Sequence, residues 1–172
     1  MAKLVDRATY SGAAAGRQTA DRPGRARELD SAGLAAWRAF LRAHAAVVRR
    51  LESDLAGSPL SLSEFDVLAT LVAAEGTLRM KDLAERVLLT KSGITRLVDR
   101  LVERGFVTRH ECAVDRRGQY AALTDEGREA LRQARRVHLP SVASAFAAHL
   151  DGPERDTIAA ALERVASANG AP

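Results

Sequence analysis

Apolar residues recur at helical spacing along most of the chain. The first stripe follows Asp30 and Ser31 and ends before Gly57-Ser58-Pro59. Its members are Leu34, Trp37, Leu41, Val48, Leu51 and Leu55. Residues three, four and seven positions apart share one side of a helix, so this segment predicts a long amphipathic helix.

The next helix is marked by its start. Ser61 and Glu64 have the spacing of a capping box, and Leu60 and Phe65 have that of a hydrophobic staple. Apolar residues then keep helical spacing until Gly76, namely Phe65, Leu68, Ala69 and Val72. A shorter helix is expected at about residues 80–88, in the segment MKDLAERVLL.

The clearest helical pattern lies between Lys91 and Arg104. Its apolar positions follow i, i+3, i+4, i+7, i+8 spacing and are Ile94, Leu97, Val98, Leu101 and Val102. Thr90 is placed to cap the N-terminus, and Gly105 stands where a left-handed glycine ends a helix. With the stripe turned inward, the other side and its flanks carry Ser92, Thr95, Arg96, Asp99 and Arg100.

Two short runs after this helix, residues 106–109 and 120–123, have strand character. Between them lies the turn-prone and charged segment Asp115-Arg116-Arg117-Gly118. The pattern therefore predicts an antiparallel ribbon with two adjacent arginines at its tip.

The remainder predicts two more helices. Thr124, followed by Asp125-Glu126-Gly127, opens a long one that we expect Pro140 to kink. Its apolar positions are Leu131, Val137, Val142, Phe146 and Leu150. Asp151-Gly152-Pro153 separates it from a final helix, whose apolar positions are Ile158, Ala161, Leu162 and Val165.

Composition limits the class of protein. The 172 residues fit one domain, with 47% hydrophobic and 28% charged residues, as in soluble globular proteins. Residues 1–29 are biased toward Ala, Arg, Gly and Thr, and we expect a mobile basic extension, either a frayed terminus or an arm that helps a dimer or DNA contact. The net charge of +4 is compatible with an anionic partner.

Several classes of site are not expected. Cys112 is the single cysteine, which suits a reducing cytosol, and no apolar stretch approaches the roughly 20 residues of a membrane-spanning helix. We therefore expect a cytoplasmic protein without a membrane partner. The four histidines lack metal-ligand spacing, so we expect no metal site. The sequence contains no phosphate loop, nucleophile elbow or catalytic carboxylate pair, so we expect that the protein binds no cofactor and is not an enzyme.

The order of helix, short helix, turn, capped helix and ribbon is that of a winged helix-turn-helix. Residues 91–104 would supply the recognition helix, because a major groove accepts one helix whose outer side is short, polar and basic. Arg96 is the candidate for a bidentate contact with guanine, while Lys91 and Ser92 are candidates for phosphate contacts, with Thr95 and Arg100 beside them. Taken alone, this helix could equally be a surface helix of mixed charge.

The ribbon adds to this interpretation. Arginine is favoured in narrow minor grooves, where the negative potential is concentrated, and Arg116 and Arg117 place two at the tip. Asp115 is placed to hold one of them through a hydrogen-bonded pair. Taken alone, the same tetrapeptide is also an ordinary solvated turn.

The segments LSEFDVLATL, MKDLAERVLLTKSGITRLVDRLVERGFVTR and DRRGQYAALTDEG resemble the multiple antibiotic resistance regulator (MarR) family of bacterial transcription factors. The resemblance covers residues 30–168 and implies a mainly α fold with a small β-wing, with the winged helix-turn-helix at about 61–124. It implies a homodimer formed through helices at about 31–56 and 125–168, and abundant Ala, Leu and Val in those segments favours the same conclusion. It also implies a repressor of a pseudo-palindromic operator in double-stranded DNA that responds to a small anionic aromatic effector, urate-like or phenolic.

A narrower resemblance concerns the urate-responsive branch of that family. The long N-terminal extension, Trp37 and Asp66 are similar to that branch, in which a Trp, an Asp and arginines near the recognition helix and wing form the ligand site. Arg96 and Arg109 are the arginines that the resemblance would assign here. The alternatives are that Trp37 is a core residue and that Asp66 is a solvated or paired surface carboxylate.

Other functions remain open from the residues alone. The strongest alternative is a sequence-tolerant architectural DNA-binding protein, and another is a protein-interaction module that keeps the winged fold. Cys112 beside the wing is either a redox-sensing thiol, with Arg109 and His110 close in sequence, or an incidental exposed cysteine.

Overall fold

The computed structural model of the 172-residue chain describes residues 29–87, 91–111 and 119–170. The side chains of Lys91 and Glu111 are not described either. Several predictions therefore lie outside the described residues: those for the extension up to residue 28, Thr90, the Lys91 side chain, Cys112, Asp115, Arg116 and Arg117.

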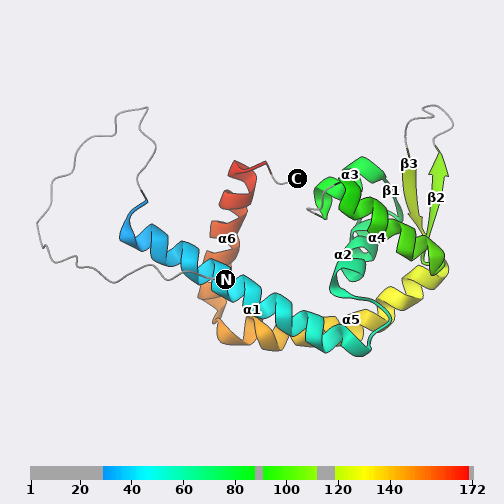
Figure 1. The fold of residues 1–172 in the computed structure, drawn as a ribbon. Coiled ribbons are helices and arrows are strands. Elements are labelled where there is room, and N and C mark those ends of the chain that lie inside the picture. Colours follow the sequence, from blue (N-terminus) through cyan, green and yellow to red (C-terminus); the bar gives the residue numbers. More distant parts are fainter. Residues whose placement is uncertain (1–28, 88–90, 112–118, 171–172) are drawn as a thin grey trace, which may run out of the picture.

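The described residues form helices and one small sheet (Figure 1). The α-helices are α1 (Ser31–Asp54), α2 (Leu62–Ala73), α3 (Met80–Arg86), α4 (Lys91–Glu103), α5 (Asp125–Ala145) and α6 (Gly152–Ala168). Two short 3-10 helices are η1 (Leu55–Gly57) and η2 (Ala147–His149). The strands are β1 (Thr77–Arg79), β2 (Val107–Glu111) and β3 (Gln119–Leu123).

The elements divide into a winged unit and a set of long helices. Figure 1 shows α2, α3, α4 and the sheet gathered at one end, with α1 and α5 side by side below them. Towards the other end, α6 rises from the end of α5 and stands apart from the winged unit. This arrangement confirms the predicted class, a mainly α chain with a small β-wing.

Local signals set the ends of several helices. Ser61 and Glu64 form the predicted capping box at the start of α2, and Thr124 accepts a hydrogen bond from the Gly127 amide at 3.0 Å at the start of α5. A second capping box, formed by Asp151 and Glu154, begins α6. Each cap satisfies amides that have no partner inside the helix.

The ribbon is one part of a three-stranded antiparallel sheet ordered β1-β3-β2. The strand β1 was not predicted, because three residues between Gly76 and Met80 are too few to show alternation. It forms by pairing with β3, with Leu78 opposite Ala121 and Arg79 opposite Tyr120. This pairing attaches the wing to the start of α3.

A single apolar cluster holds the winged unit together. Its least exposed large side chains are Leu60, Leu68, Leu71, Leu83, Ile94, Leu101, Val67, Val98 and Val107. The cluster extends into α5 through Ala130, Leu131 and Ala134. The winged unit and the first half of α5 therefore share one core.

Of the six α1 stripe residues, only Leu51 and Leu55 are buried within the described part of the chain. Two expectations for the other apolar stripes were wrong in detail. Val102, assigned to the inner side of α4, is 37% exposed. Leu150 is not part of α5, which ends at Ala145 and is followed by η2.

Among the described residues, no single helix combines the length and the apolar composition that a bilayer span needs. Only α1–η1 taken together with α2, a pair bent by 90°, has both.

Candidate DNA-binding surface

The two sides of α4 differ sharply. Ile94, Leu97, Val98 and Leu101 are at most 3% exposed and face the core. Ser92, Arg96 and Arg100 are exposed, as predicted, whereas Thr95 and Asp99 are half-buried at the flank. One face of α4 therefore presents cationic and small polar side chains while the other anchors the helix.

The C-terminal end of α4 is closed by a glycine. Gly105 has φ +74°, its amide donates to the Val102 carbonyl at 2.9 Å, and the Phe106 amide donates to the Leu101 carbonyl at 2.9 Å. These two bonds form a Schellman motif. A residue with a side chain would be strained at this positive φ, and glycine is not. The prediction for Gly105 is confirmed, and the turn leads directly into β2.

Arg104 attaches the end of α4 to the start of α2, a role that we did not predict. Its Nη1 lies 2.9 Å from Glu64 Oε1, its Nη2 donates to the Pro59 carbonyl, and its guanidinium stacks 4.6 Å from the centre of the Phe106 ring. Burial alone would raise the pKa of the Glu64 carboxyl, but hydrogen bonds from Ser61 and Arg104 outweigh it and lower the pKa. Glu64 is thus held as a carboxylate.

Arg109 on β2 contacts α4. Its Nη1 lies 2.7 Å from Asp99 Oδ1, and its Nη2 donates to the Thr95 carbonyl at 3.1 Å. Its Nε is buried and has no hydrogen-bond partner within the described residues. Arg96, by contrast, is exposed, and its Nε lies 3.4 Å from the Ser92 carbonyl of its own helix.

The residues assigned to an effector are not brought together within one chain. Trp37 lies near the start of α1, is 52% exposed and stacks on Phe40 with ring centres 5.9 Å apart. Figure 1 places that part of α1 at the opposite end of the molecule from α2, which carries Asp66, and from α4 and β2, which carry Arg96 and Arg109. Trp37 is not a core residue of the single chain.

Asp66 lies instead beside α5. Although part of its side chain is open to solvent, neighbouring protein displaces enough water to raise the pKa of its carboxyl, an effect that the nearby His138 partly offsets. Burial also lowers the pKa of His138, whose ring centre is 4.1 Å from that of Phe65. The spacing of residues along the chain could not have shown this α2–α5 contact.

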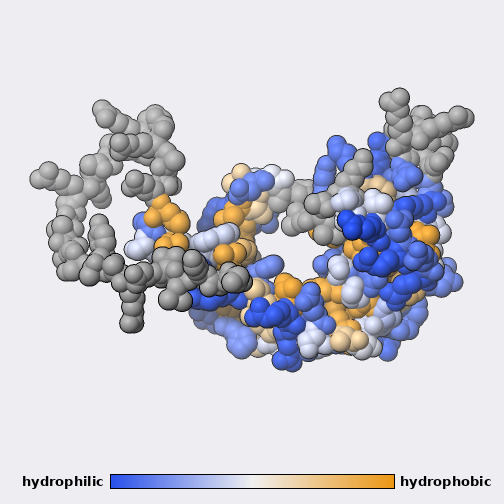
Figure 2. Space-filling view, in the orientation of Figure 1, coloured by the Kyte–Doolittle hydropathy of each residue, from blue (hydrophilic) through white to orange (hydrophobic). Residues whose placement is uncertain are grey.

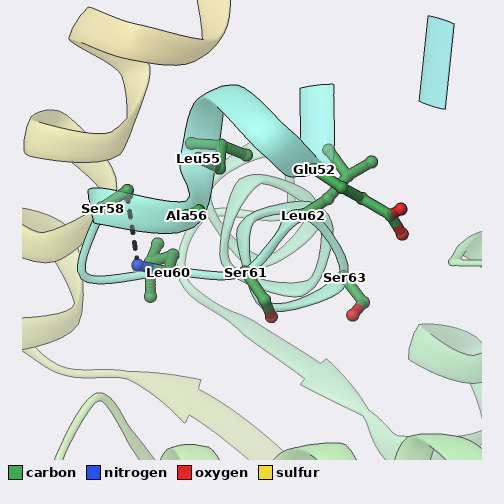
Figure 3. Close-up of a pocket in the computed structure, with 8 residues that line it drawn as sticks. All are labelled: Glu52, Leu55, Ala56, Ser58, Leu60, Ser61, Leu62 and Ser63. Carbon is green, nitrogen blue, oxygen red and sulfur yellow. Dashed lines mark hydrogen bonds between the residues drawn. The ribbon is translucent and has the colours of Figure 1, made fainter. Parts of the chain in front are cut away.

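A hollow of about 350 Å³ lies where α1 and η1 meet the start of α2 (Figure 3). It is open to solvent and lined by Glu52, Leu55, Ala56, Ser58, Leu60, Ser61, Leu62 and Ser63. It includes none of the residues predicted to bind DNA or an effector. Within the described part of the chain, no group of three His, Cys, Asp or Glu side chains is arranged to hold a metal ion.

Comparisons with known proteins agree with this geometry. The MarR family model matches residues 58–118, which span α2 to the wing. The chain is 30% identical over 128 residues to the HTH-type transcriptional regulator YkoM of Bacillus subtilis, covering 74% of this chain and 82% of YkoM. It is 33% identical over 102 residues to the transcriptional repressor YetL of the same species, covering 59% of this chain and 61% of YetL.

A solved structure shows the same fold on DNA. Sco3205, a MarR family regulator of Streptomyces coelicolor whose crystal structure contains DNA, superposes with a TM-score of 0.76 at 30% identity, covering 84% of this chain and 91% of that one. The fold, the two-sided α4 and these relatives lead to one conclusion. The chain belongs to the MarR family of DNA-binding winged helix-turn-helix transcriptional regulators.

Proposed function

We propose that a homodimer of this chain binds a pseudo-palindromic operator in double-stranded DNA and represses transcription. The observation that carries the proposal is the structure of α4, which buries one side in the core and exposes Arg96 and Arg100 on the other. A helix of this kind fits the major groove, where arginine reads guanine through two hydrogen bonds. Repression is supported by the likeness to YetL.

The contacts divide by type. Arg96, Thr95 and Arg100 would face base edges and the groove wall, while Lys91 and Ser92 at the start of α4 would meet phosphate. Arg116 and Arg117 would enter the flanking minor groove, with Asp115 holding one of them. The last three lie outside the described residues, and their roles are carried by the sequence pattern alone.

Dimerisation is supported by apolar side chains that are exposed in the described part of the chain. Trp37, Phe40 and Leu41 on α1 and Leu162 and Val165 on α6 are each at least 42% exposed. Figure 2 shows hydrophobic residues over the start of α1 and along α6. Contiguous apolar surface of this kind is uncommon in monomers, and a second copy offers the same faces in return.

The regulator is further proposed to respond to a small anionic aromatic effector, urate-like or phenolic. Trp37 lies on a part of α1 that the described residues leave exposed, so the second copy would have to complete a site that joins it to Asp66, Arg96 and Arg109. Asp66 supports such a site because its carboxyl is partly dehydrated on the side of α2 that lies near His138 of α5.

The test is a binding titration at stated salt. Duplex DNA from the region upstream of the protein's own gene is compared with a scrambled duplex, each with and without urate or salicylate. Preference for the upstream duplex by about 10³-fold or more supports the repressor. Equal affinity for both duplexes would favour the architectural alternative. If neither urate nor salicylate changed the affinity for DNA, both compounds would be excluded as effectors.

A further inference from the structure

The contact between Arg109 and α4 has a specific geometry. One guanidinium reaches the Asp99 carboxylate at 2.7 Å and the Thr95 carbonyl at 3.1 Å, and these two groups lie one helical turn apart on the same flank of α4. Arg109 is itself half-buried, with 27% of its side chain exposed, and its Nε is buried. Its cationic group is therefore turned toward α4 and away from solvent.

We propose that Arg109 is a positioning residue for DNA recognition, which acts through Asp99 and Thr95 to hold α4 and the wing in one fixed relative orientation. Arg109 lies in the middle of β2, the strand that runs from the end of α4 toward the ribbon tip. Close to the turn at Gly105 and Phe106, Val107 of β2 joins the same buried cluster as Val98 and Leu101 of α4. A polar contact farther from the turn on both elements restricts their rotation about it.

The chemistry of the pair suits this role. The planar guanidinium has several donors in a rigid arrangement, so it can bind a carboxylate and a carbonyl at once, which a lysine ammonium does less well. The contact with Asp99 is charge-assisted and short. Because both groups belong to the helix that would lie in the groove, loss of the contact would change the orientation of the helix without removing any DNA-contacting side chain.

Substituting Asp99 tests the inference, because the two explanations predict opposite changes in DNA affinity. It is a carboxylate on the flank of a helix that would face phosphates, so simple electrostatics predicts that neutralising it strengthens DNA binding. The positioning role predicts the opposite, because Asp99→Asn leaves Arg109 without its charged partner. The two explanations therefore differ in direction as well as in size.

The inference rests on the proposed operator binding, and the experiment measures both. Wild type and the variants Asp99→Asn, Arg109→Ala and Asp99→Asn/Arg109→Ala are titrated against the upstream duplex and the scrambled duplex at several salt concentrations. Arg132→Ala is the matched control, because Arg132 forms an ion pair with Glu129 within α5, away from α4. Thermal unfolding of every variant accompanies the titrations.

We expect Asp99→Asn and Arg109→Ala each to bind the upstream duplex roughly tenfold more weakly than wild type. The double variant should bind about as tightly as either single variant, because both substitutions remove the same interaction. The slope of log K against log salt should stay at the wild-type value, since Arg109 does not reach phosphate. Arg132→Ala should bind as wild type does. Asp99→Asn carries the test even if Arg109→Ala unfolds.

Other results would overturn the inference. Unchanged or tighter binding by Asp99→Asn would show that the pair does not position α4. A salt slope for Arg109→Ala that is lower by about one would show a direct phosphate contact instead. If the wild type itself showed no preference for the upstream duplex, the proposed function would fail and the inference with it, whereas selective wild-type binding with unaffected variants would remove the inference alone.

Discussion

Three of the arginines between positions 96 and 109 have different settings. Arg96 is exposed on α4, Arg104 joins α4 to Glu64 and Pro59, and Arg109 joins β2 to Asp99. Helical spacing predicted the exposure of Arg96, because it depends only on nearby apolar residues. The partners of the other two could not be predicted, since Glu64 is 40 positions from Arg104.

At the scale of the residue, Arg96 should carry sequence preference. Arg96→Ala is expected to lose about 1–3 kcal/mol of discrimination between operator and scrambled DNA, because a bidentate contact with guanine disappears. Competition titrations with the two duplexes measure it. Arg132→Ala removes the same charge from α5 and should leave the preference intact, and an Arg96→Ala protein that discriminates as well as wild type would contradict the assignment.

Glu64 links stability to pH. Its pKa is lowered from 4.5 in the folded chain, so its contribution is fully present above about pH 4.5 and is lost as the pH falls through the lower folded value. Glu64→Gln should cost about 1 kcal/mol at pH 7, a value kept small because Arg104 is partly exposed. The free energies of unfolding of variant and wild type should converge in acid.

Urea titrations at pH 7 and below pH 4 would measure that difference. Glu103→Gln removes a carboxylate from the exposed side of α4 and serves as the control. A Glu64→Gln cost that is as large in acid as at neutral pH would assign the effect to packing and not to charge.

At the scale of the element, α5 is fitted to the α4–β2 turn. The Thr124 hydroxyl donates to the Gly105 carbonyl at 2.7 Å, and the Thr124 amide donates to the Phe106 carbonyl at 3.2 Å. A Cβ at Gly127 would lie 2.2 Å from the Phe106 carbonyl oxygen. Glycine at this position therefore allows the first turn of α5 to contact the backbone that ends the recognition helix.

Gly127→Ala should accordingly destabilise the protein by about 1–3 kcal/mol, because the backbone of Phe106 or of α5 must move. Gly152→Ala is the matched control, since a Cβ there meets nothing within 4 Å at the start of α6. Urea denaturation compares the midpoints of the two variants, provided that the slope of the unfolding free energy against urea concentration is the same for both. Equal midpoints would contradict the tight fit.

The wing is the element whose tip lies outside the described residues. We expect Arg116→Ala/Arg117→Ala to weaken DNA binding and to lower the slope of log K against log salt, because two phosphate-neutralising charges are lost. Titrations at several salt concentrations give the slope. An unchanged slope would exclude the tip from the DNA contact, even if the affinity fell.

At the scale of the whole molecule, α1 and α6 leave apolar side chains exposed in a single chain. No residue of α6 is buried, and helices of such length need packing to be stable in water. The start of α1 carries Trp37, Phe40 and Leu41 at the surface. We propose that a second copy of the chain packs against both helices.

Val165→Glu tests this packing directly. Val165 is 60% exposed in the single chain, and Glu has a better helix propensity than Val, so a monomer should tolerate the change. In a dimer that buries Val165, an unpaired carboxylate would shift the protein toward monomers and weaken operator binding. Sedimentation or light scattering gives the mass, and Ser167→Glu, exposed on the opposite side of α6, is the control. Identical masses for both variants would remove Val165 from the interface.

The sequence alone determined the helices, most of their ends, the ribbon and the family. These features depend on residues within about four positions of one another, as in the capping box of Ser61 and Glu64, or on one contiguous motif. Tertiary structure decided the pairing of β1 with β3, the attachment of Arg104 and Arg109, and the exposure of Trp37 and Val102. Those outcomes depend on which segments meet in space, since Arg79 contacts Tyr120 across 41 positions of the chain.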